Sequence, residues 1–327
     1  MNKVLLLLII LFLNNCSSNK NEVQQVDKKT DNIKTILSKK IKSEQEFNVN
    51  LKIQISEGKF NSNSDNNQND IGELSYQGLL EKIGNYKYKS FNDFEYIETK
   101  PVFYNKNVIF FDNKGTIIFY DQNQKIIWKK NFYNKSEKKS KPRLNLAISE
   151  NILIIADNIA KYYAVDLYTG EILWTKKNIV PFHSDIKING GVFYIVDYKN
   201  ILRCFSIKDG SELWKVKTEE TLTKSNTKLS IVHDKKNIYF NNSIGDITAV
   251  DIISGQLIWQ LPTQNTSINK NAFQLASSKL IINDDVILFS NNKNEFYSID
   301  KKLGLINWKN NVDSILRPTV IGKFIIT

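Results

Sequence analysis

The sequence contains few of the residues from which catalytic and metal sites are usually built. Its 327 residues include two histidines, His183 and His233, and two cysteines, Cys16 and Cys204. No group of cysteine, histidine or carboxylate residues stands near either histidine at the spacing of metal ligands. Both histidines are therefore expected to be ordinary loop or surface residues. Cys204 falls in a predicted strand, where a lone cysteine is expected to behave as a small buried hydrophobic residue.

Motifs for nucleotide binding and nucleophilic catalysis are also missing. The chain has no Gly-rich phosphate loop, no nucleophile elbow and no kinase motif. Its formal charge of +11 comes from lysines that are spread along the chain rather than gathered in one cluster, which favours solvated surface lysines over a nucleic-acid-binding patch. We therefore expect no catalytic residues, no metal site, no cofactor and no nucleic-acid partner.

The chain does contain one sequence motif that recurs along its length, which we call the phrase. AVDLYTGEILW (residues 164–174) returns as AVDIISGQLIW (249–259) and YSIDKKLGLINW (297–308). Two weaker copies are CFSIKDGSELW (204–214), with Ser206 in place of the Asp, and FYDQNQKIIW (119–128), which has lost the Gly. Every tryptophan of the chain ends one copy of the phrase: Trp128, Trp174, Trp214, Trp259 and Trp308.

The phrase predicts a hairpin. The Asp carboxylate can accept hydrogen bonds from backbone N–H groups two or so residues on, and a Gly four positions later supplies the positive φ that closes the turn. Short runs of alternating apolar residues stand on both sides of the turn, as expected of two β-strands. The repeat positions are Asp121, Asp166 with Gly170, Gly210, Asp251 with Gly255, and Asp300 with Gly304.

The spacing of the phrase predicts the fold class. The tryptophans are 46, 40, 45 and 49 residues apart, and a further apolar run precedes each hairpin. A period in the forties with about four short strands per unit is typical of a β-propeller blade. A β-solenoid or a β-sandwich is the alternative, but solenoid periods are usually shorter and sandwiches do not repeat. The prediction is an all-β propeller of four-stranded blades.

The N-terminus predicts export and a lipid anchor. Lys3 is followed by ten apolar residues (4–13) and then by Cys16, a layout too short to span a membrane as a helix. This layout resembles a bacterial lipoprotein signal, in which the cysteine is acylated and becomes the new N-terminus. Asn14 and Asn15 replace the usual small residues, and Ser17 favours the outer membrane. With Cys16 acylated, no intramolecular disulfide is possible; the alternative is a soluble secreted protein with an incidental cysteine.

Three segments follow from these patterns: a signal peptide (1–15), a lipid-anchored tether (16–46) and a propeller domain (47–327). The tether is rich in Lys, Asn, Ser, Asp and Gln. The propeller begins with FNVNLKIQI (47–55), whose strict alternation predicts a half-buried strand that pairs with the last blade and closes the ring. RPTVIGKFIIT (317–327) is expected to open a sixth blade.

The hairpin phrase resembles the pyrroloquinoline-quinone-like propeller repeat, in which the Trp docks between neighbouring blades. The order of lipid-anchor signal, tether, leading strand and blades is similar to that of the propeller lipoproteins of the outer-membrane β-barrel assembly machinery. That resemblance implies eight blades, of which about five and the start of a sixth are present, so the chain is expected to be truncated at its C-terminus. It also implies a non-enzymatic scaffold at the periplasmic face of the outer membrane.

In the family that the chain resembles, inter-blade loops bind the periplasmic repeat domains of the barrel-inserting subunit and help deliver nascent outer-membrane proteins. The corresponding loop is TEETLTKSN, which offers Leu222 and Lys224 where the family has a Leu-x-Leu-Arg-like stretch. The family's acidic residues ahead of the next blade fall near Ser277 and Lys279, which are not acidic. Leu222 and Lys224 are therefore the expected partner contacts.

Two alternative functions share the repeat. One is a periplasmic quinoprotein dehydrogenase; such enzymes are usually much longer and carry a vicinal Cys–Cys disulfide above the quinone, whereas this chain has no adjacent cysteines. The other is a propeller scaffold in a different envelope complex, which the sequence does not distinguish from the first interpretation.

Overall fold

The structure is a computed structural model that describes residues 85–86, 100–220, 227–263, 275–321 and 324–327. Every described residue belongs to one compact unit of the chain. The predicted signal peptide, tether and leading strand (47–55) lie outside the described residues. The described residues cover the repeat region, and most of its regular structure consists of β-strands.

Five four-stranded antiparallel sheets follow one another along the chain, each with its strands in sequence order. We call them blades 1 to 5. Their bounds are β1 (Val102–Tyr104), β2 (Asn107–Phe111), β3 (Thr116–Tyr120) and β4 (Ile126–Asn131); β5 (Leu144–Ser149), β6 (Ile152–Asp157), β7 (Lys161–Asp166) and β8 (Ile172–Lys177); β9 (Lys187–Asn189), β10 (Val192–Val196), β11 (Ile201–Ser206) and β12 (Glu212–Lys217); β13 (Ile231–His233), β14 (Asn237–Asn241), β15 (Ile247–Asp251) and β16 (Leu257–Leu261); β17 (Ile281–Asn283), β18 (Val286–Asn291), β19 (Glu295–Asp300) and β20 (Ile306–Asn310).

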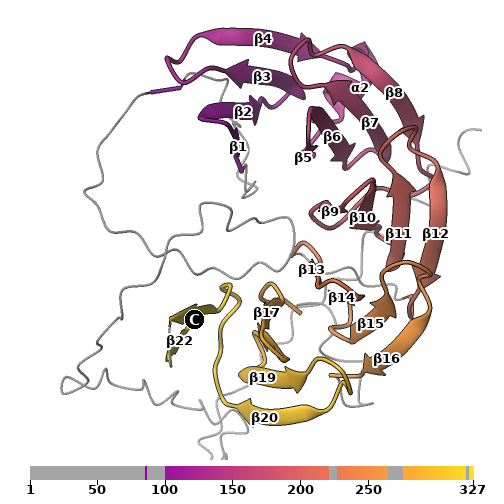
Figure 1. Cartoon of the computed structure of the whole chain (residues 1–327). Helices are drawn as coiled ribbons and strands as arrows, with labels where there is room; N and C mark the ends of the chain where they lie inside the picture. Colours follow the sequence, from indigo (N-terminus) through magenta and orange to yellow (C-terminus); the bar gives the residue numbers. More distant parts are fainter. Residues whose placement is uncertain (1–84, 87–99, 221–226, 264–274, 322–323) are drawn as a thin grey trace, which may run out of the picture. The chain divides into compact units, whose positions relative to one another are not determined.

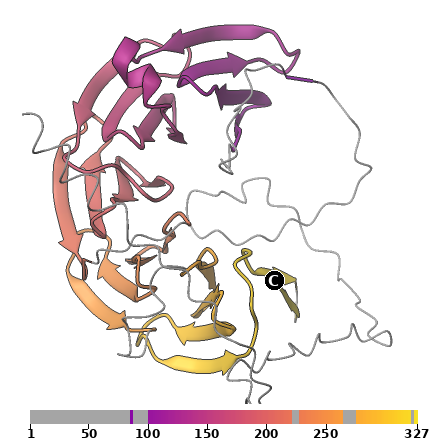
Figure 2. The same ribbon diagram turned by 180° about the vertical axis from the view of Figure 1, so that it is seen from behind.

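The predicted blades are confirmed. Figures 1 and 2 show the five sheets succeeding one another in sequence order, with the first strand of each on one side of the series and the fourth strand on the other. We refer to the fourth strands β4, β8, β12, β16 and β20 as the outer strands. The segment after blade 5, which is expected to open a sixth blade, forms two paired strands, β21 (Thr319–Ile321) and β22 (Phe324–Ile326).

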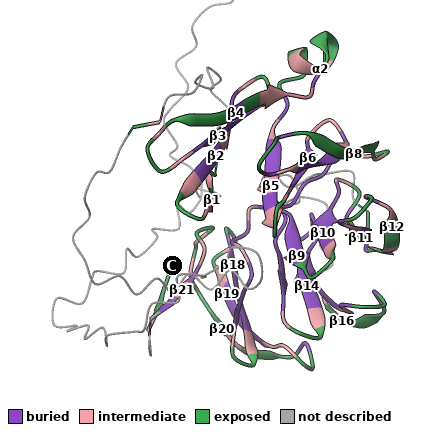
Figure 3. Ribbon diagram, turned by 45° about the horizontal axis from the view of Figure 1, so that its top comes forward, coloured by how far each residue is buried: buried purple, intermediate pink, exposed green. Residues whose placement is uncertain are grey.

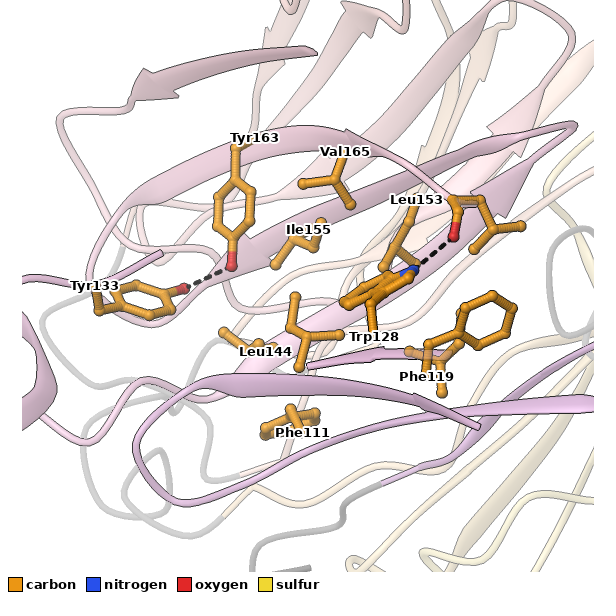
Figure 4. Close-up of a cluster of buried hydrophobic side chains, with 12 residues drawn as sticks. Phe111, Phe119, Trp128, Tyr133, Leu144, Leu153, Ile155, Tyr163 and Val165 are labelled. Carbon is orange, nitrogen blue, oxygen red and sulfur yellow. Dashed lines mark hydrogen bonds between the residues drawn. The ribbon is translucent and has the colours of Figure 1, made fainter. Parts of the chain in front are cut away.

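Hydrophobic cores fill the spaces between consecutive blades. Between blades 1 and 2, Phe119 and Trp128 pack with Leu153, Ile155 and Val165 (Figure 4). Equivalent clusters lie between blades 2 and 3, 3 and 4, and 4 and 5, and a smaller one joins blade 5 to β21. Blades 2 to 5 therefore bury both faces because a neighbour covers each one, which is why the repeat is needed.

Each outer strand contains a register shift at the same place in the repeat. In blade 2, Ala164 pairs with Trp174 while the next residue, Val165, pairs with Ile172, so Leu173 is an extra residue on the outer strand. The same shift occurs in the other four blades. An inserted residue of this kind is a β-bulge, and it turns the side chains on either side of it to new directions.

A short helix, α2 (Lys135–Lys139), interrupts the connection between blades 1 and 2. Asn134 caps it by accepting hydrogen bonds from the backbone N–H groups of Ser136 and Glu137, and the Glu137 carboxylate accepts one from the Asn134 N–H in return. This reciprocal pair is a capping box. Within the described residues no helix is long and apolar enough to cross a membrane.

Candidate protein-interaction surface

The predicted hairpin turn has the geometry that its residues require. In blade 2 the Asp166 carboxylate accepts hydrogen bonds from the N–H groups of Tyr168 (3.0 Å) and Thr169 (2.8 Å). Gly170 closes the turn at φ +66°, and its N–H donates to the Asp166 carbonyl oxygen (2.8 Å). The bond from the Thr169 N–H is the main reason why the pKa of Asp166 lies below its ordinary value. Asp251 and Asp300 make the same carboxylate contacts in blades 4 and 5.

The two weaker copies form the turn with other residues. In blade 3, where Ser206 replaces the Asp, the Asp209 carboxylate accepts a hydrogen bond from the Ser211 N–H (3.1 Å). In blade 1, which lacks the Gly, Gln124 adopts the left-handed conformation at φ +65° and Asp121 still accepts from Asn123 and Lys125. The turn is thus retained in all five blades despite the changes in sequence.

Each repeat tryptophan of the first four blades lies against the turn glycine of the next blade. A Cβ atom added to Gly170 would come within 2.8 Å of the Trp128 ring. The equivalent pairs are Trp174 with Gly210, Trp214 with Gly255 and Trp259 with Gly304. The glycine is therefore required twice, for its positive φ and for the close approach of the indole ring.

Three of these tryptophans also hydrogen-bond across the blade boundary. The Trp128 indole N–H donates to the Leu167 carbonyl oxygen at 2.8 Å (Figure 4). Trp174 and Trp259 make the same bond to Ile207 (2.8 Å) and Lys301 (3.0 Å). The hairpins are consequently held rigidly to one another, and the outer strands that they carry are held with them.

The outer strands expose aliphatic side chains one and two residues before each tryptophan, except where Glu212 and Asn307 occupy these positions. Figure 3 shows the exposed colour along β4, β8, β12, β16 and β20. Leu257 and Leu305 have 59% and 61% of their surface exposed. The complete set, which we call the rim, is Ile126, Ile127, Ile172, Leu173, Leu213, Leu257, Ile258, Leu305 and Ile306, with Tyr168, Ile253 and Leu303 in the turns. Exposed apolar residues that recur on neighbouring blades are a candidate protein-interaction surface.

A charged cluster joins the segments that precede the first strands of blades 3, 4 and 5. The Asp185 carboxylate, just before β9, lies 3.1 Å from Lys228 Nζ before β13 and 2.5 Å from Lys279 Nζ before β17. Lys228 Nζ also donates to the Asn145 side chain on β5. Burial favours the neutral form of the Asp185 carboxyl, but Lys228, Lys279 and Lys100 outweigh it and hold its pKa well below the ordinary value. The cluster therefore ties blades 3, 4 and 5 together by charge.

The predicted partner contacts Leu222 and Lys224 and the predicted lipidation site Cys16 lie outside the described residues. Cys204 is buried in β11, as predicted. The prediction that the histidines are loop or surface residues is confirmed for the loop position of His183 and is wrong for His233, which lies in a strand; both side chains are buried. His183 stacks on Tyr198 with ring centroids 4.0 Å apart, and His233, on β13, has Nε2 3.0 Å from the Ile188 carbonyl oxygen. They pack and hydrogen-bond inside the blades rather than at the surface.

Sequence reasoning missed a second repeated turn, between the second and third strands of each blade. Asp112, Asp157 and Asp197 start it in blades 1 to 3 and are buried, and Asn242 and Asn291 replace them in blades 4 and 5. Three positions later stands a residue with positive φ: Gly115, Ala160, Asn200, Gly245 and Asn294. An Asp or Asn stands at the end of each upstream apolar run, and in four of the five blades a Gly or Asn follows three positions later. These residue types favour turns, so the sequence offered a signal for this second turn.

Among the described residues, no group of three or more His, Cys, Asp or Glu side chains that could hold a metal ion occurs. Cys204, the one cysteine among them, is enclosed in the core between blades 3 and 4, where burial raises the pKa of its thiol to about 12.

Comparison with known proteins agrees with the repeat architecture. A family model described as outer membrane protein assembly factor BamB matches residues 113–327. No curated protein sequence matches the chain. Among solved structures, BamB from Moraxella catarrhalis is similar with a TM-score of 0.59 at 14% identity, over 69% of this chain and 68% of that one.

Two enzymes share the fold. A quinohemoprotein alcohol dehydrogenase from Pseudomonas putida HK5 has a TM-score of 0.51 at 13% identity, over 65% of this chain and 41% of the enzyme. A europium-containing methanol dehydrogenase has a TM-score of 0.52 at 13% identity, over 64% of this chain and 50% of the enzyme. At these identities the likeness concerns the fold alone, and the chain spans half or less of each dehydrogenase.

Proposed function

The chain belongs to the outer membrane protein assembly factor BamB family, and we propose that it is a non-enzymatic scaffold that assists the folding and insertion of outer-membrane β-barrel proteins. In this proposal it binds the barrel-inserting subunit of the assembly machinery and stands close to nascent barrel proteins. The acylated Cys16 holds it at the periplasmic face of the outer membrane, with residues 16–46 as the tether.

The observation that carries the proposal is the rim. At least one exposed aliphatic side chain stands one or two residues before the tryptophan of every blade, on hairpins fixed to one another by the contacts between tryptophan and glycine. A scaffold needs a wide surface whose parts do not move relative to one another, because ordering a mobile surface costs binding free energy. Residues 221–226, which include Leu222 and Lys224, connect β12 to β13 and supply a second proposed contact.

Affinity capture of the full-length protein tests the function. It should recover the barrel-inserting subunit, and loss of the protein should lower outer-membrane porin levels without abolishing them. Recovery of bound quinone, or dye-linked alcohol oxidation in the presence of calcium, would replace the scaffold by a dehydrogenase. Capture of a different envelope complex would support a scaffold of another kind.

Two variants separate the proposed contact surfaces. Leu173→Asp places a charge on the rim, and Thr175→Asp places the same charge on an exposed polar position of the same strand as its control. Leu222→Asp with Lys224→Glu changes the loop. Loss of capture with Leu173→Asp alone assigns the contact to the rim, whereas loss with the loop variant alone assigns it to residues 221–226.

A further inference from the structure

The connection between blades 1 and 2 is an exception to the even spread of lysines along the chain. Residues 135–143 (KSEKKSKPR) carry four lysines and one arginine against one glutamate. We call them the basic segment. They include α2, which has no buried residue, and Figure 3 shows this helix projecting beyond the neighbouring strands.

The one acidic residue of the basic segment is occupied by local contacts. The Glu137 carboxylate accepts the Asn134 N–H at 2.9 Å in the capping box and lies 3.5 Å from Lys161 Nζ on β7. It therefore does not neutralise the lysines beside it. Lys135, Lys138 and Lys139 form no ion pair within the part of the chain that the structure describes; Lys135 and Lys139 are exposed and Lys138 is half-buried on the capped helix.

The basic segment also lacks what a protein interface requires. Protein interfaces have an apolar or aromatic centre with charged residues at the edge. The exposed large hydrophobic residues of the described chain include none between Ile127 and Tyr168, so the lysines surround no such centre. Contacts made by clustered lysines alone are typical of binding to an anionic lipid surface, where each lysine near the surface adds to the attraction.

We propose that the basic segment binds anionic phospholipid headgroups at the membrane surface, through Lys135, Lys138 and Lys139. A capped helix presents the three charges together, so little side-chain and backbone order has to be gained on binding. This inference concerns a second membrane contact and does not depend on the rim or on the partner subunit.

Vesicle co-sedimentation tests the proposal on the full processed chain with Cys16→Ser, which removes any acyl anchor. The protein should bind vesicles of equal parts phosphatidylglycerol and phosphatidylcholine but not pure phosphatidylcholine. Lys135→Gln, Lys138→Gln and Lys139→Gln together should weaken binding by on the order of tenfold to a hundredfold. Replacing the three by arginine should retain it, because the charge is unchanged.

A matched control removes the same charge elsewhere. Lys125, Lys208 and Lys235 are exposed and stand in turns at the opposite ends of the strands, so their replacement by glutamine should leave binding unchanged. Equal binding by the wild type and the α2 variant would overturn the proposal, as would failure of the wild type to bind the anionic vesicles. Displacement by free glycerol phosphate at constant ionic strength would assign a phosphate site instead. Retention of an acidic protein but not of vesicles would make the segment a protein contact.

Discussion

The Trp259 ring lies so close to Gly304 of the next blade that a Cβ atom on this glycine would come within 2.5 Å of it. The two residues are 45 positions apart and belong to different copies of the same hairpin. The glycine of one copy of the motif thus packs against the tryptophan of the copy before it. This contact forms only when two consecutive blades lie side by side.

Gly304→Ala should destabilise the protein. The substitution places a side chain at φ +70° and against the indole ring, and a non-glycine residue in that conformation alone costs about 1–3 kcal/mol. Urea denaturation measures the free energy of unfolding. Gly191→Ala is the control, because its φ is not positive and nothing lies within 4 Å of the added atom; we expect a change within about 0.5 kcal/mol. Equal losses in the two variants would show that neither the positive φ of Gly304 nor its contact with Trp259 matters for stability.

Trp259→Phe should cost more stability than Trp214→Phe. Trp259 donates its indole N–H to the Lys301 carbonyl oxygen, whereas the Trp214 indole forms no hydrogen bond within the described residues. Both rings are partly buried against the next blade, so the loss of packing is similar. The lost hydrogen bond should add about 1 kcal/mol to the cost of Trp259→Phe. Thermal unfolding of the two variants compares them, and the reverse order would contradict the assignment.

Asp185→Asn should lower stability at neutral pH by about 2 kcal/mol, since it removes a charged acceptor from two lysines of other blades. Because the folded-state pKa of Asp185 lies below its unfolded value, the stabilisation is complete above pH of about 4 and is lost as the pH falls through the folded pKa. The stability difference between the wild type and Asp185→Asn should therefore shrink in acid.

Asp285→Asn serves as the comparison for this pH series. Its side chain is exposed, and its carboxylate lies 3.7 Å from Lys301 Nζ and 3.5 Å from Lys302 Nζ, so the exposed pairs should contribute less than about 1 kcal/mol. A pH-independent difference for Asp185→Asn would argue that lost packing, not charge, destabilises that variant.

Cys204 should react with thiol reagents only after unfolding. The thiol is enclosed in the core between blades 3 and 4, and burial raises its pKa to about 12, so little reactive thiolate forms at neutral pH. In a Cys16→Ser background, labelling with iodoacetamide should rise with urea in step with tryptophan fluorescence. Rapid labelling in native buffer would mean that blades 3 and 4 separate readily.

The local part of the fold could be predicted from the sequence, and the contacts between blades could not. The Asp and Gly of the hairpin act within five residues, and the alternation of apolar residues marks each strand. By contrast, the tie between Asp185, Lys228 and Lys279 joins residues that are 43 and 94 positions apart, and no local pattern places them together.

The buried histidines show the same limit. His233 is polar, yet it occupies a strand whose side chains are all buried, and the Ile188 carbonyl oxygen that accepts it belongs to the previous blade. From a short stretch of sequence, a polar residue is predicted to lie at the surface. Its burial can be predicted only when the distant residue that hydrogen-bonds to it is known. The rim was not predicted: the aliphatic residues close to each tryptophan were visible in the sequence, but their exposure follows from the register shift in the outer strands.

That register shift has a consequence for solubility. Each outer strand is an edge with unpaired backbone groups and exposed aliphatic residues, which is the combination that leads chains to polymerise through their sheets. A residue inserted at Leu173, and at the same point in the other blades, breaks the even spacing of hydrogen-bonding groups that an incoming strand would have to match. The protein can thus expose apolar edge strands and still be a poor template for fibre growth.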